Sequence, residues 1–337
     1  MLLPFEGQIS MKNIFLKLLN FTFICFVFIS ASAIFPVENV FSEILSHFCL
    51  QYFLVSLLFL IVYCFLKKWK SVVVALLLFI SFSSILIPFY VSPDAKKNEK
   101  FEDITLLQFN INYRHEDVNK VIDWINDFHS KKYGATTEIP DIVLIEEATP
   151  EIAEKLNALS VHYPYKISEA EAGAYGMVLY SKIPIAHYER KYFSRFAGQY
   201  TIANMSTPNM KIPFVLVELH ARSPGHIEKL NPRRFQLEEI ANIISRLSCA
   251  GKILVGDLNT TPYSPYFKKL EKISGLRSFM RGHGVSGTWP NFLPFLCRIP
   301  LDHVLVSSHI KVLERNINPD LGSDHFPVTS RLRIYAK

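Results

Sequence analysis

Residues 251–262, with the sequence GKILVGDLNTTP, hold the pattern that decides the fold of this chain. A short apolar run, Ile253 to Val255, leads directly into Gly256, Asp257 and Asn259. This pattern predicts a buried strand that ends abruptly in a turn. Ligands of α/β sheets bind at the carboxyl ends of strands, so Asp257 and Asn259 are candidate site residues. A plain Asp/Asn turn after a core strand is the alternative, because both residues favour turns through local hydrogen bonds.

The same arrangement recurs along residues 104–337. Strands are expected at 104–110, 141–145, 176–181, 212–219, 298–306 and 328–334, and helices at 118–128, 149–159 and 232–247. The polar residues at or near the ends of these strands are Asn110, Glu146, Glu147, His220, Asp302, Asp324 and His325. A single histidine at a strand end is more often structural than catalytic, so His220 is a candidate site residue only because the other strand ends also carry polar residues.

Two adjacent glutamates, Glu146 and Glu147, follow the apolar run 142–145. A strand of this type is buried on both faces, so acidic side chains at its end are unlikely to be simple solvent-exposed surface residues. Strand alternation places the two side chains on opposite faces, and only one of them is expected to face a given site.

Half of the 337 residues are hydrophobic, and much of this apolar content lies in residues 1–95. The formal net charge of +6 is modest. It suits a phosphate-bearing substrate, but it lacks the dense basic patches of a dedicated nucleic-acid binder. The five cysteines form no CxxC or Cys/His pattern, which argues against a zinc site.

Three apolar stretches, residues 14–35, 48–66 and 71–91, are each about 20 residues long, enough to cross a bilayer as helices. They predict three transmembrane helices, a linker at 96–103 and a globular domain at 104–337. A cleaved signal peptide for the first stretch and a buried soluble helical hairpin are the alternatives. The chain is therefore expected to be an integral membrane protein, and the sequence indicates no protein partner.

Lysine placement predicts the orientation of this anchor. Residues 36–47 contain no Lys or Arg, whereas residues 67–70 read Lys-Lys-Trp-Lys. Positively charged connections stay in the cytoplasm, so three spans place the globular domain on the extracytoplasmic side. Lys96, Lys97 and Lys100, which follow the third stretch, oppose this orientation.

The chemistry of the strand-end residues indicates phosphate ester hydrolysis. Carboxylate and amide oxygens without thiolates suit a hard cation such as Mg²⁺ or Mn²⁺. Histidines beside carboxylates suit proton transfer and stabilisation of phosphate charge. Hydrolysis of a phosphate ester needs a Lewis acid, a base for water and donors to the phosphoryl oxygens.

Ordered motifs across residues 104–335 resemble those of the endonuclease/exonuclease/phosphatase superfamily, which has the DNase I-like fold. The motifs are LLQFN at 106–110, DIVLIEE at 141–147, GMVLYSKIPI at 176–185, VELH at 217–220, GDLNTTP at 256–262, LDHVLVS at 301–307 and GSDHFPV at 322–328. The resemblance implies an α/β protein, a four-layered α/β sandwich in which two mixed sheets pack face to face with helices outside.

The resemblance also implies roles for individual residues. Asn110 and Glu147 would hold or orient the divalent metal, and Asp324 would join the metal or the histidine network. Asp257 would activate water, and Asn259 would hold a phosphate oxygen. His220 and His325 would both act on the phosphoryl group, and Asp302 would orient His325.

The sequence departs from the family pattern at two places. Glu146 stands where the family usually has glutamine, and two extra residues, Pro300 and Leu301, precede Asp302. The expected function is a membrane-anchored, Mg²⁺-dependent phosphoesterase whose substrate is a lipid headgroup or another phosphate ester near the bilayer. A nuclease acting on nucleic acid and a non-catalytic binding module on the same fold are the alternatives. Specificity is expected in the loops 186–210 and 278–297.

Overall fold

The structure is a computed structural model that describes residues 11–35, 40–93, 98–129, 139–223 and 230–337. The chain divides into two compact units, Met1–Ile85 and Leu86–Lys337. Residues 94–97, which include the start of the predicted linker, and 130–138 lie outside the described residues.

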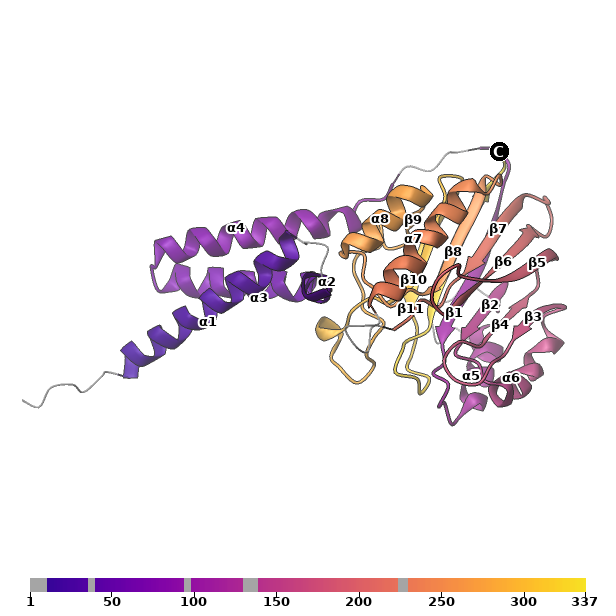
Figure 1. The fold of residues 1–337 in the computed structure, drawn as a ribbon, viewed down its shortest axis with the longest axis horizontal. Coiled ribbons are helices and arrows are strands. Elements are labelled where there is room, and N and C mark those ends of the chain that lie inside the picture. Colours follow the sequence, from indigo (N-terminus) through magenta and orange to yellow (C-terminus); the bar gives the residue numbers. More distant parts are fainter. Residues whose placement is uncertain (1–10, 36–39, 94–97, 130–138, 224–229) are drawn as a thin grey trace, which may run out of the picture. The chain divides into compact units, whose positions relative to one another are not determined.

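The first unit is helical (Figure 1). Its elements are α1 (Met11–Ile34), α2 (Val40–Ser46), α3 (Cys49–Phe65) and α4 (Trp69–Leu86), whose last residue falls in the second unit. Aromatic side chains pack α1 against α3: the ring centroids of Phe23 and Phe59 are 4.8 Å apart. The hydroxyl of Tyr63 also donates to the side-chain oxygen of Asn20 at 3.0 Å.

Among the described residues, two helical segments, Asn13–Ile34 and Trp69–Phe89, are long and apolar enough to cross a membrane, not the predicted three. The predicted span at 48–66 forms α3, which has 17 residues. At about 1.5 Å per residue it is roughly 25 Å long, short of the roughly 30 Å hydrocarbon core. Signal sequences and core helices of soluble proteins share the length and composition of these two segments, which are identified by those two properties alone.

The second unit contains two six-stranded sheets (Figure 1). In order across the first sheet, the strands are β11 (Ile310–Ile317), β12 (Val328–Tyr335), β1 (Phe101–Asn110), β2 (Ile142–Glu146), β4 (Met177–Ser181) and β3 (Tyr165–Glu169). Those of the second are β5 (Ile185–Tyr192), β6 (Gln199–Ser206), β7 (Pro213–Glu218), β8 (Gly251–Asp257), β10 (Asp302–Val306) and β9 (Arg277–Ser278). The pairs β1–β2 and β7–β8 are parallel and the other pairs are antiparallel, so both sheets are mixed.

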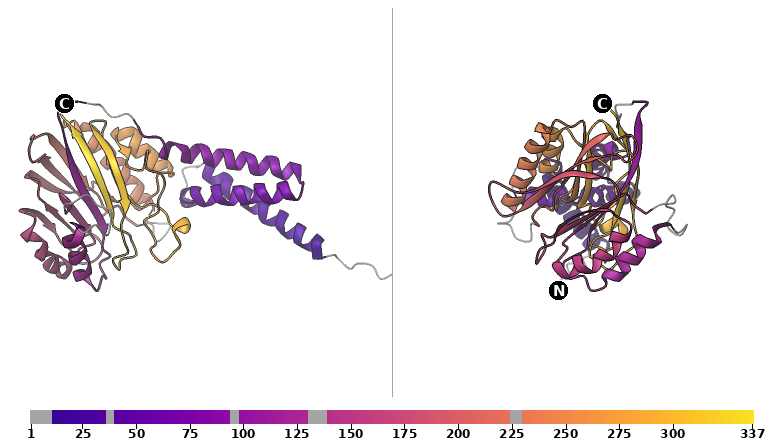
Figure 2. Two further views of the ribbon diagram at one scale, coloured as in Figure 1. Left: turned by 180° about the vertical axis from the view of Figure 1, so that it is seen from behind. Right: turned by 90° about the vertical axis from the view of Figure 1, so that its right-hand side faces the viewer.

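Helices cover the outer faces of the two sheets (Figure 2). The helices are α5 (Val118–Asn126) and α6 (Pro150–Leu156) on the first sheet, and α7 (Leu230–Arg246) and α8 (Pro265–Ser274) on the second. Short 3₁₀ turns occur at η1 (Ile87–Phe89), η2 (Asp127–His129), η4 (Asn157–Val161) and η6 (Phe295–Cys297). The predicted α/β sandwich of two mixed sheets with outer helices is confirmed.

Capping residues fix where these helices begin. The Asp117 side chain accepts a hydrogen bond from the backbone N–H of Lys120, and the Thr149 hydroxyl accepts one from Ile152. Each caps an otherwise unpaired donor of the first helical turn. Pro150 follows Thr149 at the first helical position, where a missing N–H costs nothing.

Five strands were not anticipated from the sequence: β3, β5, β6, β9 and β11. The segment 186–210, expected to be a loop, is mostly the β5–β6 hairpin. Strand β5 lies at a sheet edge and reads IAHYERKY, with most side chains exposed. An edge strand pairs on one side only, so it does not need the continuous apolar run that marks the buried strands.

The chain just after α4 packs against the second unit. The carbonyl oxygen of Phe89 accepts hydrogen bonds from the backbone N–H groups of Gly282 and Gly284, at 2.9 and 2.8 Å. The rings of Phe89 and Tyr263 meet edge-on, with centroids 5.7 Å apart. A Cβ on Gly282 would lie 2.7 Å from the Cα of Ser92, so this approach requires glycine. Residues 86–93 therefore belong to the sandwich.

Candidate active site

Polar residues from the two facing sheets meet at the carboxyl ends of β1, β2, β7 and β8. Asn110 ends β1, and its side-chain nitrogen donates to Glu147 Oε1 at 3.0 Å and to Asp257 Oδ2 at 3.1 Å. His220 follows β7, and its Nε2 lies 3.8 Å from both of these carboxylates. The structure thus brings together four residues that the sequence predicted for one site.

The turn after β8 holds Asp257 and Asn259 in place. The backbone N–H of Asn259 donates to Asp257 Oδ1 at 2.8 Å, an arrangement typical of Asp in turns. Asn259 has a φ of 50°, and its side-chain nitrogen reaches the carbonyl of Ala221 at 2.9 Å and His220 Nε2 at 3.3 Å. The local turn and the functional site therefore coincide at these residues.

A chain of hydrogen-bonded and ionisable groups links Asp302, His325 and Asp257. His325 Nδ1 lies 2.9 Å from Asp302 Oδ2, and His325 Nε2 lies 3.6 Å from Asp257 Oδ2. All three residues are buried. The two-residue insertion before Asp302 does not displace it, because β10 pairs in register with β8 and sets Asp302 opposite Asp257.

Burial and neighbouring charges shift the pKa values of this group. Burial raises the pKa of Asp257 to about 6, although the positive charge of His325 opposes the change. Burial disfavours the charged imidazole of His325, but the carboxylates of Asp302 and Asp257 outweigh it and raise its pKa to about 10. Burial likewise opposes ionisation of Asp302, yet the charge and hydrogen bond of His325 keep the pKa of Asp302 below its usual range.

Both glutamates at the end of β2 reach the site, which strand alternation alone did not predict. Glu147 has a φ of 59°, so the chain leaves the strand conformation there. Its Oε2 accepts a hydrogen bond from the backbone N–H of Tyr113 at 3.1 Å. Glu146 is fully buried and accepts hydrogen bonds from the backbone N–H of Asp257 and from Gln108.

The pKa of Glu146 is raised well above its usual value, first by burial and then by the charges of Glu218 and Asp257. A neutral Glu146 has nearly the size and shape of the glutamine that the family resemblance places there. Burial and the neighbouring carboxylates therefore disfavour the extra negative charge expected from the sequence at this position.

Asp324 lies at the edge of this group, next to His325 in the chain. Its Oδ1 accepts a hydrogen bond from Asn112 at 2.8 Å, and its Oδ2 accepts one from the indole N–H of Trp289 at 3.0 Å. Both carboxylate oxygens thus bind side chains of two different loops. These bonds hold Asp324 against the two loops; the sequence left its role open between the metal and the histidine network.

Several residues that hold the site in place were missed by the sequence reasoning. The Gln108 side-chain nitrogen donates to Glu146 at 2.6 Å and to Asp302 at 2.8 Å, which ties the two sheets together. Arg233 on α7 is fully buried, and its guanidinium donates to the carbonyl of Asn259. Gln108 sits two residues before Asn110, a spacing that strand alternation could have flagged as the same face.

The donor set suits a hard divalent cation. Within the described part of the chain, Asp257, Asp302 and His325 each offer a ligand atom, and these atoms lie within 4.8 Å of one another. His325 Nδ1 is already committed to Asp302, however, whereas Glu147 places a second carboxylate beside that of Asp257. The Asn110 side-chain nitrogen donates to both carboxylates, and its oxygen accepts from the backbone N–H of Asn112. Carboxylate and amide oxygens are the ligands that Mg²⁺ and Mn²⁺ prefer.

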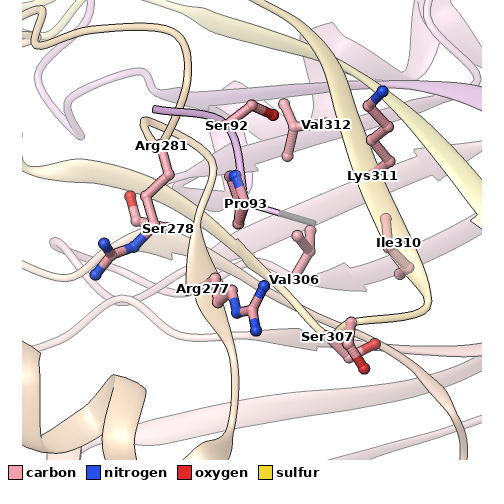
Figure 3. Close-up of a pocket in the computed structure, with 11 residues that line it drawn as sticks. Ser92, Pro93, Arg277, Ser278, Arg281, Val306, Ser307, Ile310, Lys311 and Val312 are labelled. Carbon is pink, nitrogen blue, oxygen red and sulfur yellow. The ribbon is translucent and has the colours of Figure 1, made fainter. Parts of the chain in front are cut away.

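Two pockets of the second unit differ in their relation to this site. The pocket beside Ser92 and Pro93 encloses about 20 Å³, room for about one water molecule, and contains none of the site residues (Figure 3). A wider cavity of about 460 Å³ includes Asn112, Arg114 and Lys120 in its lining. Because Asn112 binds Asp324, this wider cavity adjoins the site.

Solved structures with the same fold were found at low sequence identity. An endonuclease/exonuclease/phosphatase family protein from Bacteroides thetaiotaomicron has 16% identity and a TM-score of 0.56, over 71% of this chain and 100% of its own. TDP2 from D. rerio, complexed with a single-strand DNA product, has 15% identity and a TM-score of 0.56, over 68% and 99%. The human Nocturnin catalytic domain, with a bound sulfate anion, has 16% identity and a TM-score of 0.52, over 69% and 96%.

A comparison with curated proteins gave no match. The sequence profile of the Endonuclease/Exonuclease/phosphatase family matches residues 107–325, which is more than half of the chain. The matched range runs from β1 to His325 and includes the residues assembled between the sheets. The chain therefore belongs to the endonuclease/exonuclease/phosphatase family.

Proposed function

We propose that this chain is a membrane-anchored phosphoester hydrolase that depends on a divalent metal ion. The observation that carries the proposal is the placement of His325 between Asp302, at 2.9 Å, and Asp257, at 3.6 Å. A non-catalytic module would have no need for two buried carboxylates around one histidine, because buried charges are costly unless they are paired.

Asp257 would accept a proton from the attacking water. Its pKa of about 6 leaves it mostly ionised at neutral pH while keeping it a stronger base than an exposed aspartate. His325, held charged by Asp302, would donate to the phosphoryl oxygens and stabilise their developing charge. His220 and Asn259, which lie 3.3 Å apart, would supply further donors.

Glu147 would hold Mg²⁺ or Mn²⁺, beside Asp257, and Asn110 would orient the two carboxylates through its side-chain nitrogen. When bound, the ion would act as a Lewis acid toward a phosphoryl oxygen. The contacts of Asp324 with Asn112 and Trp289 favour its role on the histidine side of the site, where it holds the loop that carries His325.

For the anchor, we propose that α1, α3 and α4 cross the membrane. The segments Asn13–Ile34 and Trp69–Phe89 are each long and apolar enough to cross a membrane. An extracytoplasmic active site requires α3 to cross as well, as a short span. Phe48 and Leu66 flank α3 and extend its apolar length, and a short span can be accommodated by local thinning of the bilayer.

The test is an assay of the full chain in detergent against a soluble phosphodiester, bis(p-nitrophenyl) phosphate, and a soluble monoester, p-nitrophenyl phosphate. Hydrolysis of either with Mg²⁺ or Mn²⁺, lost with EDTA and in Asp257→Asn, is expected. Equal rates for the wild type and Asp257→Asn would overturn the proposal. Single-stranded DNA and RNA serve as further substrates, and faster cleavage of either would favour the nuclease alternative.

A further inference from the structure

The loop between β9 and β10 carries exposed apolar side chains next to the site. Phe292 is 76% exposed and Phe295 is 51% exposed, and Leu296 beside them is half exposed. Figure 1 shows this segment, with η6 at its tip, extending away from both sheets. Contiguous exposed apolar side chains mark contacts with a partner or a membrane more often than scattered ones do.

Hydrogen bonds hold the base of this loop in a defined shape. The Arg298 side chain donates to the carbonyl of Leu293 at 2.7 Å and to that of Asn291 at 3.3 Å. Its guanidinium also lies over the ring of Phe326, 4.2 Å from the centroid. Phe292 and Phe295 are thus exposed on a loop whose base is ordered by hydrogen bonds.

The loop is connected to the active site through Asp324. The Trp289 indole donates to the Asp324 carboxylate, and the backbone N–H of Asn291 donates to the Asp324 carbonyl at 2.8 Å. On its other carboxylate oxygen, Asp324 binds Asn112, which lines the cavity of about 460 Å³. Asp324 therefore joins the apolar loop, the cavity and the chain position next to His325. The cavity is lined by the basic residues Arg114 and Lys120 and by the acidic residues Glu116 and Asp117.

The same loop also holds the end of the membrane-length helical segment. Gly282 and Gly284, near the start of the loop, donate to the Phe89 carbonyl, and Phe89 is the last residue of the candidate span Trp69–Phe89. If that segment lies in a bilayer, its end and the apolar loop are held on one structural unit. The small pocket beside Ser92 is rimmed by Arg277 and Lys311, which complement anionic lipid headgroups (Figure 3).

We infer that Phe292 and Phe295 insert into the bilayer and that the substrate is a phosphate ester of a membrane lipid. The lipid's apolar part would remain beside the loop, and its headgroup would enter the cavity lined by Asn112, Arg114 and Lys120. The inference rests on the proposed phosphoesterase function. Insertion of aromatic side chains at the membrane interface gains free energy from the apolar area that they bury.

Insertion is measured by tryptophan quenching, which does not depend on activity. The full chain is placed in nanodiscs whose phosphatidylglycerol and phosphatidylethanolamine carry bromine on the acyl chains, and the emission of the parent protein is subtracted. Phe292→Trp should be quenched. Tyr192→Trp should not be, because Tyr192 is 68% exposed on β5, at the edge of its sheet opposite β9. Absence of quenching at position 292, or equal quenching at both positions, would overturn the inference.

Lipid hydrolysis supplies the second measurement. In vesicles of the same two phospholipids, the double variant Phe292→Ser/Phe295→Ser should release phosphate ester product at least about tenfold more slowly than the wild type, since it loses two inserted aromatic rings. The matched control, Tyr192→Ser/Met210→Ser, removes two exposed apolar side chains elsewhere and should match the wild type. Equal rates for the two double variants would overturn the role of the loop.

The soluble ester separates the two proposals. Wild-type protein that hydrolyses bis(p-nitrophenyl) phosphate but none of the phospholipid overturns the lipid inference and leaves the phosphoesterase function standing. Wild-type protein that hydrolyses neither overturns the phosphoesterase function itself, whatever the quenching experiment shows.

Discussion

The side-chain nitrogen of Asn110 lies 3.1 Å from Asp257 Oδ2, although the two residues are 147 positions apart and end strands of different sheets. This contact marks where the two sheets meet at the carboxyl ends of β1 and β8. Each strand delivers one polar side chain to the same point, and His220, Glu147 and His325 surround it. Substitutions at this meeting point should therefore affect catalysis more than stability.

Asp257→Asn should lower hydrolysis by on the order of 10²–10⁴-fold, because the substitution removes the base and keeps the shape of the side chain. The rate on bis(p-nitrophenyl) phosphate and the thermal unfolding midpoint of the full chain are measured together. A variant that unfolds like the wild type but lacks activity is expected. Asp123→Asn, an exposed carboxylate on α5, is the control and should retain full activity. Near-full activity in Asp257→Asn would refute the role assigned to this carboxylate.

Glu147→Gln should raise the Mg²⁺ concentration needed for half-maximal activity, and should lower the maximal rate, by at least about tenfold, since an anionic metal ligand is lost. Glu146→Gln should change either quantity far less, because Glu146 is fully buried and its raised pKa disfavours the charge that an anionic metal ligand carries. Metal titrations of both variants check this. A larger effect from Glu146→Gln would show that Glu146, and not Glu147, holds the metal.

Glu146→Gln should also flatten the pH dependence of stability. A buried carboxyl whose pKa is raised in the folded state binds more protons there than in the unfolded chain, so stability falls as pH rises above its ordinary pKa of 4.5. The thermal unfolding midpoint of the wild type should therefore fall more than that of Glu146→Gln between pH 5 and pH 8, two points chosen to lie above that value. The contribution of Glu218, whose pKa burial raises to about 7, remains in both proteins. Parallel curves for the two proteins would contradict a raised pKa of Glu146 in the folded state.

A phosphatase reporter fused after Lys337 should be active in the exported compartment. The reason is the charge of Lys67, Lys68 and Lys70 between α3 and α4, which favours the cytoplasmic side for that connection. A fluorescent protein that folds only in the cytoplasm should stay dark at the same position. A bright cytoplasmic reporter would mean that α3 does not cross, since two spans return the chain to the side from which it started.

The sequence by itself determined the family and the strand ends that carry its polar residues. Buried strands such as β8 and β2 can be recognised in the sequence because both of their faces must be apolar. The polar residue that ends each apolar run is then easy to identify. Local turn chemistry at Asp257 and Asn259 could be read in the same way, because it depends on residues two positions apart. Edge strand β5 and the β5–β6 hairpin could not, since an exposed edge imposes no such pattern.

Only the tertiary structure decided how these residues share protons and partners. The raised pKa of Glu146 depends on burial between two sheets and on Glu218 and Asp257, which are distant in the chain. The partners of Asp324 come from the loops of Asn112 and Trp289, so spacing along the sequence could not separate it from Glu147. Composition likewise predicted a third membrane-length helix, but the length of α3 is fixed by where its backbone hydrogen bonds begin and end, at Cys49 and Phe65.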